Sequence, residues 1–226
     1  MNYRTPESLH YLFDNGSNQY TQAIQAIGEV IEPYDADKQF PALGFGARIP
    51  PNPDTFYEFF LNLQENPYCN GVQGILNSYR AALEQVELSG PTYFTPVINH
   101  VARFAQSYQD GRQYFVLLIL TDGIITDFEE TKAAIVQASQ LPMSIIIVGV
   151  GNEDFSAMEE LDSDKGHLNA GGQVAVRDIV QFVEMRKFLA DEGYWDQEKL
   201  AKAVLAEVPK QVVKWMKMRG LKPLQQ

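Results

Sequence analysis

Two side chains with oxygen atoms, those of Asp122 and Thr92, are the candidates for binding a cation. Asp122 follows an unbroken apolar run, Tyr114 to Leu120, and a threonine, and Gly123 comes directly after it. A short apolar run that ends in a polar turn is typical of a strand buried on both faces of a parallel sheet, and ligands of open α/β folds bind at the carboxyl edge of the strands. Thr92 lies in another turn, GPTYF. One carboxylate and one hydroxyl could supply part of the roughly six-oxygen shell of Mg²⁺, but not all of it.

Other interpretations of these carboxylates stay open. Asp122 could be a turn or helix-capping aspartate. A magnesium-dependent phosphotransferase or hydrolase would need a second carboxylate or a lysine near Asp122. Asp127 is close in sequence, but its position before an apolar-periodic stretch favours a helix cap. We therefore expect a binding module rather than an enzyme, and keep the enzyme as the alternative.

Other motifs give weaker signals. The Gly-x-Gly pairs at 44/46 and 149/151 do not complete a dinucleotide-binding motif, and they suit tight turns better. His10, His100 and His167 do not have zinc-site spacing. Asp162, Asp164 and Gly166 resemble the start of a calcium loop without its later acidic ligands, so we interpret them as a solvated loop.

Composition narrows the classes of partner and compartment. The formal net charge is −11, which argues against a nucleic-acid backbone as the main partner. The single cysteine, Cys69, excludes an intrachain disulfide framework and favours a reducing, cytoplasmic location. There is no secretory signal pattern at the N-terminus, and no apolar run approaches the ~20 residues of a membrane span. We expect no direct membrane insertion.

Hydrophobic periodicity predicts a doubly wound, mostly parallel α/β sheet with helices on both faces. We expect an N-terminal segment at 1–16, one domain at 17–217 and a C-terminal tail at 218–226. The predicted helices cover 17–31, 70–86, 95–108, 127–138, a short segment from 154, and 198–217. The predicted strands are 42–47, 57–61, 114–121, 143–151 and a segment within 174–183.

An ordered set of motifs resembles the von Willebrand factor A-like domain of the copine family, over about residues 8 to 215. These motifs are FPALGFGARIPP, ENPYCNGVQGIL, GPTYFTPVINHVARFA, LLILTDGIITD, LPMSIIIVGVG, DFSAMEELDSD and RDIVQFV. The resemblance implies a metal-ion-dependent adhesion site at the carboxyl edge of the sheet. It assigns Thr92, in GPT, and Asp122, in TDG, as metal ligands. The family's first strand and its D-x-[ST]-x-S turn should precede SLHYL, and we do not find them here.

The resemblance therefore implies an incomplete site in a truncated domain whose central first strand is missing. We expect weak binding of Mg²⁺ or Mn²⁺. Calcium would act only through the family's C2 domains, which are absent from this sequence. The implied function is a protein-interaction module linked to calcium-dependent phospholipid-binding proteins of membrane signalling. The expected partners are proteins that offer an acidic side chain and full-length copines, which would recruit this cytoplasmic chain to the plasma membrane.

Overall fold

The computed structural model describes residues 3–163, 166–189 and 195–222. These residues form two compact units. The first unit comprises the described residues up to Tyr93, with Val150–Asn152 and Met185–Ala201. The second comprises Phe94–Gly149, Glu153–Glu184 and the described residues from Lys202 onward.

The second unit is built on a parallel sheet of three strands in the order β12-β9-β8. The strands are β8 (Phe115–Thr121), β9 (Met143–Gly149) and β12 (Val180–Glu184). Thr121 pairs with Gly149, which also pairs with Glu184, so the carboxyl ends of all three strands meet at one edge. The predicted α/β fold with a parallel sheet is confirmed.

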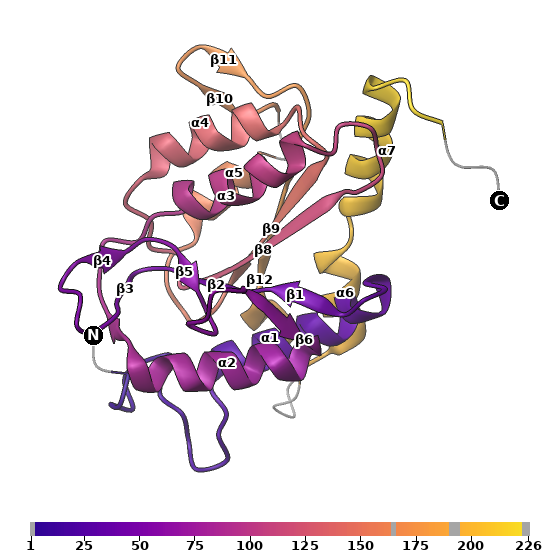
Figure 1. Ribbon diagram of the computed structural model, residues 1–226. Coiled ribbons are helices and arrows are strands. Elements are labelled where there is room, and N and C mark those ends of the chain that lie inside the picture. Colours follow the sequence, from indigo (N-terminus) through magenta and orange to yellow (C-terminus); the bar gives the residue numbers. More distant parts are fainter. Residues whose placement is uncertain (1–2, 164–165, 190–194, 223–226) are drawn as a thin grey trace. The chain divides into compact units, whose positions relative to one another are not determined.

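Helices flank this sheet, as Figure 1 shows. They are α3 (Thr95–Gln106), α4 (Phe128–Ala138), α5 (Ser156–Asp162) and α7 (Val208–Met218). Helix α3 lies beside α4 and against β8, α5 lies against β12, and α7 lies against β9. Proline stands in the first turn of α3 and of α7, where the missing N–H costs no intrahelical hydrogen bond.

The two long apolar runs are buried to different degrees. Every residue of β9 is buried, as predicted for a strand with a neighbour on each side and helices above and below. In β8 only Ile119 and Thr121 are buried, and Val116 is 41% exposed. The prediction that this run is buried on both faces is therefore wrong for much of its length. The physical reason is its place in the sheet, because β8 pairs only with β9 among the described residues.

The first unit is organised by α1 (Gln19–Ile31) and α2 (Gly71–Gln85), which pack together. Asn18 caps α1 in a reciprocal capping box with Thr21. Gly28 lets the helices approach closely, since a Cβ there would lie 2.6 Å from Val72 Cγ2. The first unit also contains short antiparallel strands and two 3₁₀ turns. They are β1 (Gln39–Pro41) with β6 (Tyr68–Asn70), β2 (Leu43–Gly44) with β5 (Phe59–Phe60), β3 (Ala47–Arg48) with β4 (Thr55–Phe56) and β7 (Glu87–Leu88), η1 (Glu32–Tyr34) and η2 (Met185–Phe188).

The structure corrects three predicted elements. The single strand expected at 42–47 is wrong, because it is divided between β2 and the start of β3, with Gly46 at a φ of +70° between them. The strand expected at 57–61 is wrong as well, because only the two residues of β5 are strand within that range. The single helix expected at 198–217 is also wrong. It is two helices, α6 (Gln197–Val204) and α7, and Pro209 cannot continue a helix from the preceding turn.

A small hairpin, β10 (Asn169–Ala170) with β11 (Gln173–Val174), follows the segment that was interpreted as a solvated loop around Asp162 and Gly166. Asp164, from the rejected calcium-loop interpretation, lies outside the described residues. Within the described ranges, no helix combines the length and the apolar character that a bilayer span requires.

Candidate functional site

Asp122 lies directly after β8, at the carboxyl edge of the parallel sheet. Its side chain is half-buried, and its Oδ1 accepts the Ile124 N–H at 3.3 Å. The Thr121 hydroxyl accepts the Gly123 N–H at 3.0 Å. These two short-range hydrogen bonds shape the turn, and the Asp122 Oδ2 atom has no hydrogen-bond partner among the described residues. One carboxylate oxygen is therefore available to a cation or to water.

An aromatic ring packed against two glycines holds this turn in place. Gly123 has a φ of +96°, and a Cβ there would lie 2.6 Å from Phe155 Cδ1. A Cβ on Gly149, at the end of β9, would lie 2.6 Å from Phe155 Cε1. The ring also contacts Phe182 of β12, with centroids 5.5 Å apart. Close packing thus explains Gly149 without a nucleotide, in line with the structural interpretation of the glycine pairs.

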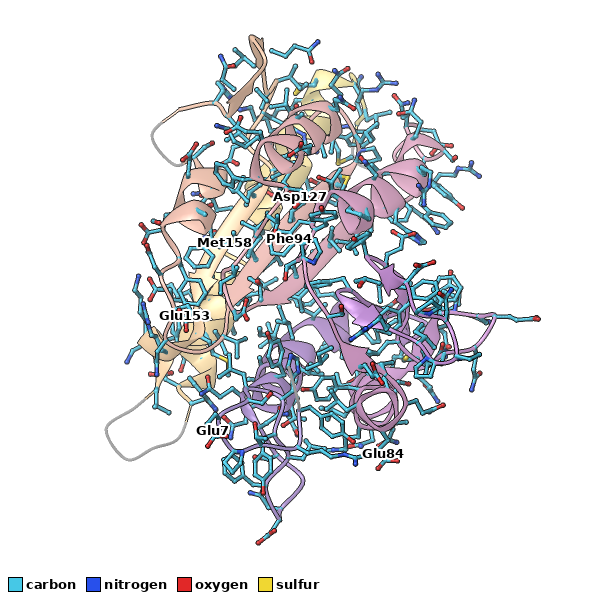
Figure 2. The ribbon with its side chains drawn as sticks, turned by 90° about the vertical axis from the view of Figure 1, so that its left-hand side faces the viewer. Glu7, Glu84, Phe94, Asp127, Glu153 and Met158 are labelled. Carbon is cyan, nitrogen blue, oxygen red and sulfur yellow. The ribbon has the colours of Figure 1, made fainter. Side chains whose placement is uncertain are left out.

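Asp127 joins the start of α4 to the start of α3, and Figure 2 labels it together with Phe94. Its carboxylate is buried, and it accepts the Phe94 N–H at 3.0 Å and the Thr95 N–H at 2.9 Å. Asp127 does occupy the N-cap position of α4, but its side chain makes no capping bond to that helix. Asp127 does cap a helix, as predicted, but the helix is α3 and not α4. The physical reason is that the N–H groups at the start of α3 lie within reach of its carboxylate.

The bonding of Asp127 bears on the choice between a binding site and an active site. Each of its oxygens already accepts a backbone N–H, so it is poorly placed to serve as a second metal ligand or as a general base. Asp154 is similarly engaged, since it accepts the Ser156 N–H at 2.9 Å and the Ser156 hydroxyl at 3.1 Å. Of these three aspartates, Asp122 is therefore the one with a carboxylate oxygen that accepts no hydrogen bond among the described residues.

Thr92 lies in an irregular stretch of the first unit, two residues before Phe94. It is half-buried, and the next residue, Tyr93, stacks on Tyr57 with ring centroids 4.5 Å apart. Its hydroxyl has no hydrogen-bond partner among the described residues. Thr92 belongs to the first unit and Asp122 to the second, so their meeting at one site stays a prediction.

The donor set fits a hard cation in kind but not in number. A hydroxyl and a carboxylate oxygen are ligands that Mg²⁺ and Mn²⁺ accept, whereas Mg²⁺ needs about six oxygens. Among the described residues, no group of three or more histidine, cysteine, aspartate or glutamate side chains could hold a metal ion. Water or an outside carboxylate would have to complete the shell.

The histidine at the start of the chain has a structural role. His10 Nδ1 lies 2.8 Å from the Tyr79 hydroxyl, and its ring stacks on Tyr20 with centroids 4.2 Å apart. Burial lowers the pKa of His10 to about 4, which keeps the ring neutral at physiological pH. A neutral His10 ring packs among the aromatic side chains without a buried charge. Its ring has no carboxylate as a hydrogen-bond partner among the described residues, so the arrangement of a catalytic base is not formed.

Sequence reasoning missed Phe155 and the bonds from Asp127 to α3, which together fix the turn that presents Asp122. The signal for Phe155 was available in the Gly-rich turns, because glycine often marks a close approach by a neighbouring group.

The family model for copines matches residues 8–224, which is most of the chain. The parallel sheet, its flanking helices and the aspartate at the end of β8 agree with the earlier resemblance. This chain belongs to the copine family.

Proposed function

We propose that this chain is a non-enzymatic protein-interaction module that uses Asp122, together with Thr92, to hold Mg²⁺ or Mn²⁺ weakly. The bound cation would then accept a carboxylate from a partner protein in an open coordination position. Membership of the copine family supports the interaction role. The observation that carries the metal proposal is the unpartnered Oδ2 of Asp122, on a turn fixed by Phe155.

The cellular location follows from the same proposal. Calcium-dependent phospholipid binding would belong to partner proteins such as full-length copines, and this chain would be cytoplasmic and reach the plasma membrane through them.

An enzyme that transfers or hydrolyses phosphate is the weaker alternative, because both oxygens of Asp127 are engaged by backbone N–H groups. A screen of nucleotides and phosphoesters with Mg²⁺ should give no turnover above the buffer blank.

Paramagnetic Mn²⁺ offers a direct test, because it broadens the NMR signals of amides near the site. We expect the broadening to centre on Gly123 and Ile124 and to require millimolar-range Mn²⁺. Asp122→Asn is the sharp variant, since its amide oxygen can still accept the Ile124 N–H while the negative charge is lost. It should weaken binding by about tenfold, equivalent to about 1.4 kcal/mol.

Asp154→Asn is the matched control at the same edge, because its carboxylate is already engaged by Ser156. It should leave Mn²⁺ broadening at Gly123 unchanged. Equal loss in both variants would mean that general negative charge attracts the ion. Unchanged binding in Asp122→Asn would contradict the site assignment and leave the family membership intact.

A further inference from the structure

The outer edge of β8, on the side away from β9, is not paired. The Phe115 N–H donates to the Pro142 carbonyl at 2.8 Å, so Phe115 and every second residue after it point their backbone groups toward β9. The N–H and C=O groups of Val116, Leu118 and Leu120 therefore point to the opposite side. Among the described residues, no strand pairs with that side, so it is left as a template for a further strand.

The same three residues carry apolar side chains that are not fully covered. Because side chains alternate along a strand, those of Val116, Leu118 and Leu120 lie on one face of the sheet. Val116 is 41% exposed, and Leu118 and Leu120 are half-buried, whereas every residue of β9 is buried. A strand added at this edge would cover unpaired backbone groups and exposed apolar surface in one contact.

Strand β8 lacks the features by which edge strands commonly avoid such pairing. Its residues, Phe115–Thr121, include no charged side chain and no proline, and its register with β9 runs without a bulge. Its seven residues also exceed the usual strand length of about 5–6. An edge that is long, straight and uncharged favours association with another strand.

We propose that the open edge of β8 pairs with the same edge of a second copy of this chain. The two strands would run antiparallel, with Leu118 facing Leu118 of the second copy and Val116 facing its Leu120. Each free edge group then meets its complement, which gives about six N–H···O=C bonds between the copies. The pair is closed by a two-fold axis, so neither copy keeps an open β8 edge.

Charge favours this antiparallel arrangement. Asp122 directly follows β8, and the chain has a net charge of −11. In the antiparallel pair the two Asp122 residues lie at opposite ends of the paired strands, roughly 27 Å apart, which is well beyond a Debye length of about 8 Å. Parallel pairing would bring them to neighbouring positions about 5 Å apart, where like charges repel. The contact between the copies itself is made by uncharged residues.

Sedimentation velocity of the full chain, between about 1 and 200 µM, tests the association. EDTA would be present throughout, so that the proposed cation site at Asp122 cannot contribute. We expect a reversible monomer–dimer equilibrium with a dissociation constant in the micromolar range, because a single strand pair forms a small interface.

Variants at Val116 connect the dimer to this edge. Val116→Pro removes an N–H that points away from β9, and Val116→Lys places a charge on the edge; each should weaken dimerisation at least tenfold. Val174→Lys is the matched control, because Val174 is also an exposed strand valine, 54% exposed, but lies in β11. It should leave the dimer unchanged. Circular dichroism should show all three variants folded, and if Val116→Pro does not fold, Val116→Lys carries the test.

Hydrogen exchange resolves the two sides of the strand. The amides of Val116, Leu118 and Leu120 should exchange more slowly as the protein concentration rises. Those of Leu117 and Ile119, which face β9, should be slow at every concentration. Equal concentration dependence on both sides would contradict pairing at this edge.

A cysteine at the proposed two-fold axis tests the register. Leu118→Cys should form a disulfide-linked dimer in oxidised glutathione, because opposed residues of an antiparallel pair have Cα atoms about 5.5 Å apart, within the range that a disulfide spans. Val174→Cys, exposed and away from this edge, should cross-link at least tenfold more slowly.

Three further results would overturn the proposal. The first is a chain that stays monomeric at about 200 µM, and the second is a dimer that survives both Val116 variants. The third is association that continues to larger species without stopping at the dimer, because a two-fold pair leaves no β8 edge for a third copy. Equal cross-linking of Leu118→Cys and Val174→Cys would contradict the register.

Discussion

Replacing Asp127 by Ala should destabilise the second unit strongly. Asp127 is 7% exposed, and its carboxylate accepts two backbone N–H groups, from Phe94 and Thr95, at the N-terminus of α3. Phe94 is completely buried, so its N–H would lose its partner without gaining water. A hydrogen bond to a charged group contributes about 1.5–3 kcal/mol, and loss of an N-cap costs about 0.5–2 kcal/mol. Because these contributions overlap, we expect a loss of about 2–4 kcal/mol.

Urea unfolding followed by circular dichroism would measure this loss. Asp127→Asn should cost less, about 1–2 kcal/mol, because its amide oxygen can still accept one N–H. Asp154→Ala is the control: its carboxylate is exposed and bonds only to Ser156, so the expected change is below about 1 kcal/mol. If Asp127→Ala prevents folding, hydrogen exchange of the Phe94 and Thr95 amides in Asp127→Asn still tests the interaction.

A free energy of unfolding for Asp127→Ala within about 0.5 kcal/mol of the unchanged chain would refute this reasoning. The same variants also separate a capping role from a metal-binding one. Millimolar Mg²⁺ should stabilise the unchanged chain and Asp127→Asn equally, because the carboxylate is already occupied by two N–H donors. Stabilisation that disappears in Asp127→Asn would make this residue a metal ligand.

Three further predictions concern packing and pH. Gly123→Ala should destabilise by about 2 kcal/mol in thermal melts, because it combines a positive φ with a clash against Phe155. Because the pKa of His10 is lowered to about 4, unfolding takes up a proton between pH 6.5 and 4. The free energy of unfolding should therefore fall by about 3 kcal/mol as the pH drops through that window. The His10→Gln variant should show a weaker dependence of stability on pH. Trp215→Ala should cost about 3–5 kcal/mol in urea unfolding, whereas Trp215→Phe, which loses only the bond to the Gln140 carbonyl and some area, should cost less than half as much. A flat pH profile in the unchanged chain, or equal melting temperatures for Gly123→Ala and its parent, would contradict these expectations.

The elements predicted well from sequence are those whose signal is local and long. The unbroken apolar run of β9 and the helical stripe of α2 specify their elements, because a run of that length is typical of a buried strand and the stripe is long enough to show helical spacing. The strands of the first unit could not be predicted in this way. Pieces such as β2, only two residues long, exist through pairing with partners such as β5, and no periodicity can form in two residues.

The candidate site divides in the same way. Asp122 was identifiable because an apolar run ending in Thr-Asp-Gly predicts a strand end within a few residues. The bonds from Asp127 to Phe94 were not, since the two residues lie 33 positions apart and any helix with free N–H groups could have received that carboxylate. The break before α7 could have been predicted, because Pro209 is a strong signal for the first turn of a new helix.

The contacts around Asp122 also bear on what limits the proposed cation site. Its turn is held by the Thr121 hydroxyl and the Phe155 ring, and neighbouring Asp127 is fixed by two N–H donors, all within the second unit. Ordering this turn should therefore cost little when a cation binds, and the shortage of oxygen donors should limit the affinity. A partner carboxylate would relieve that shortage. The cation and an acidic partner should then strengthen each other's binding by the same factor, as linkage requires, so that a weak site by itself can serve as a partner-dependent one.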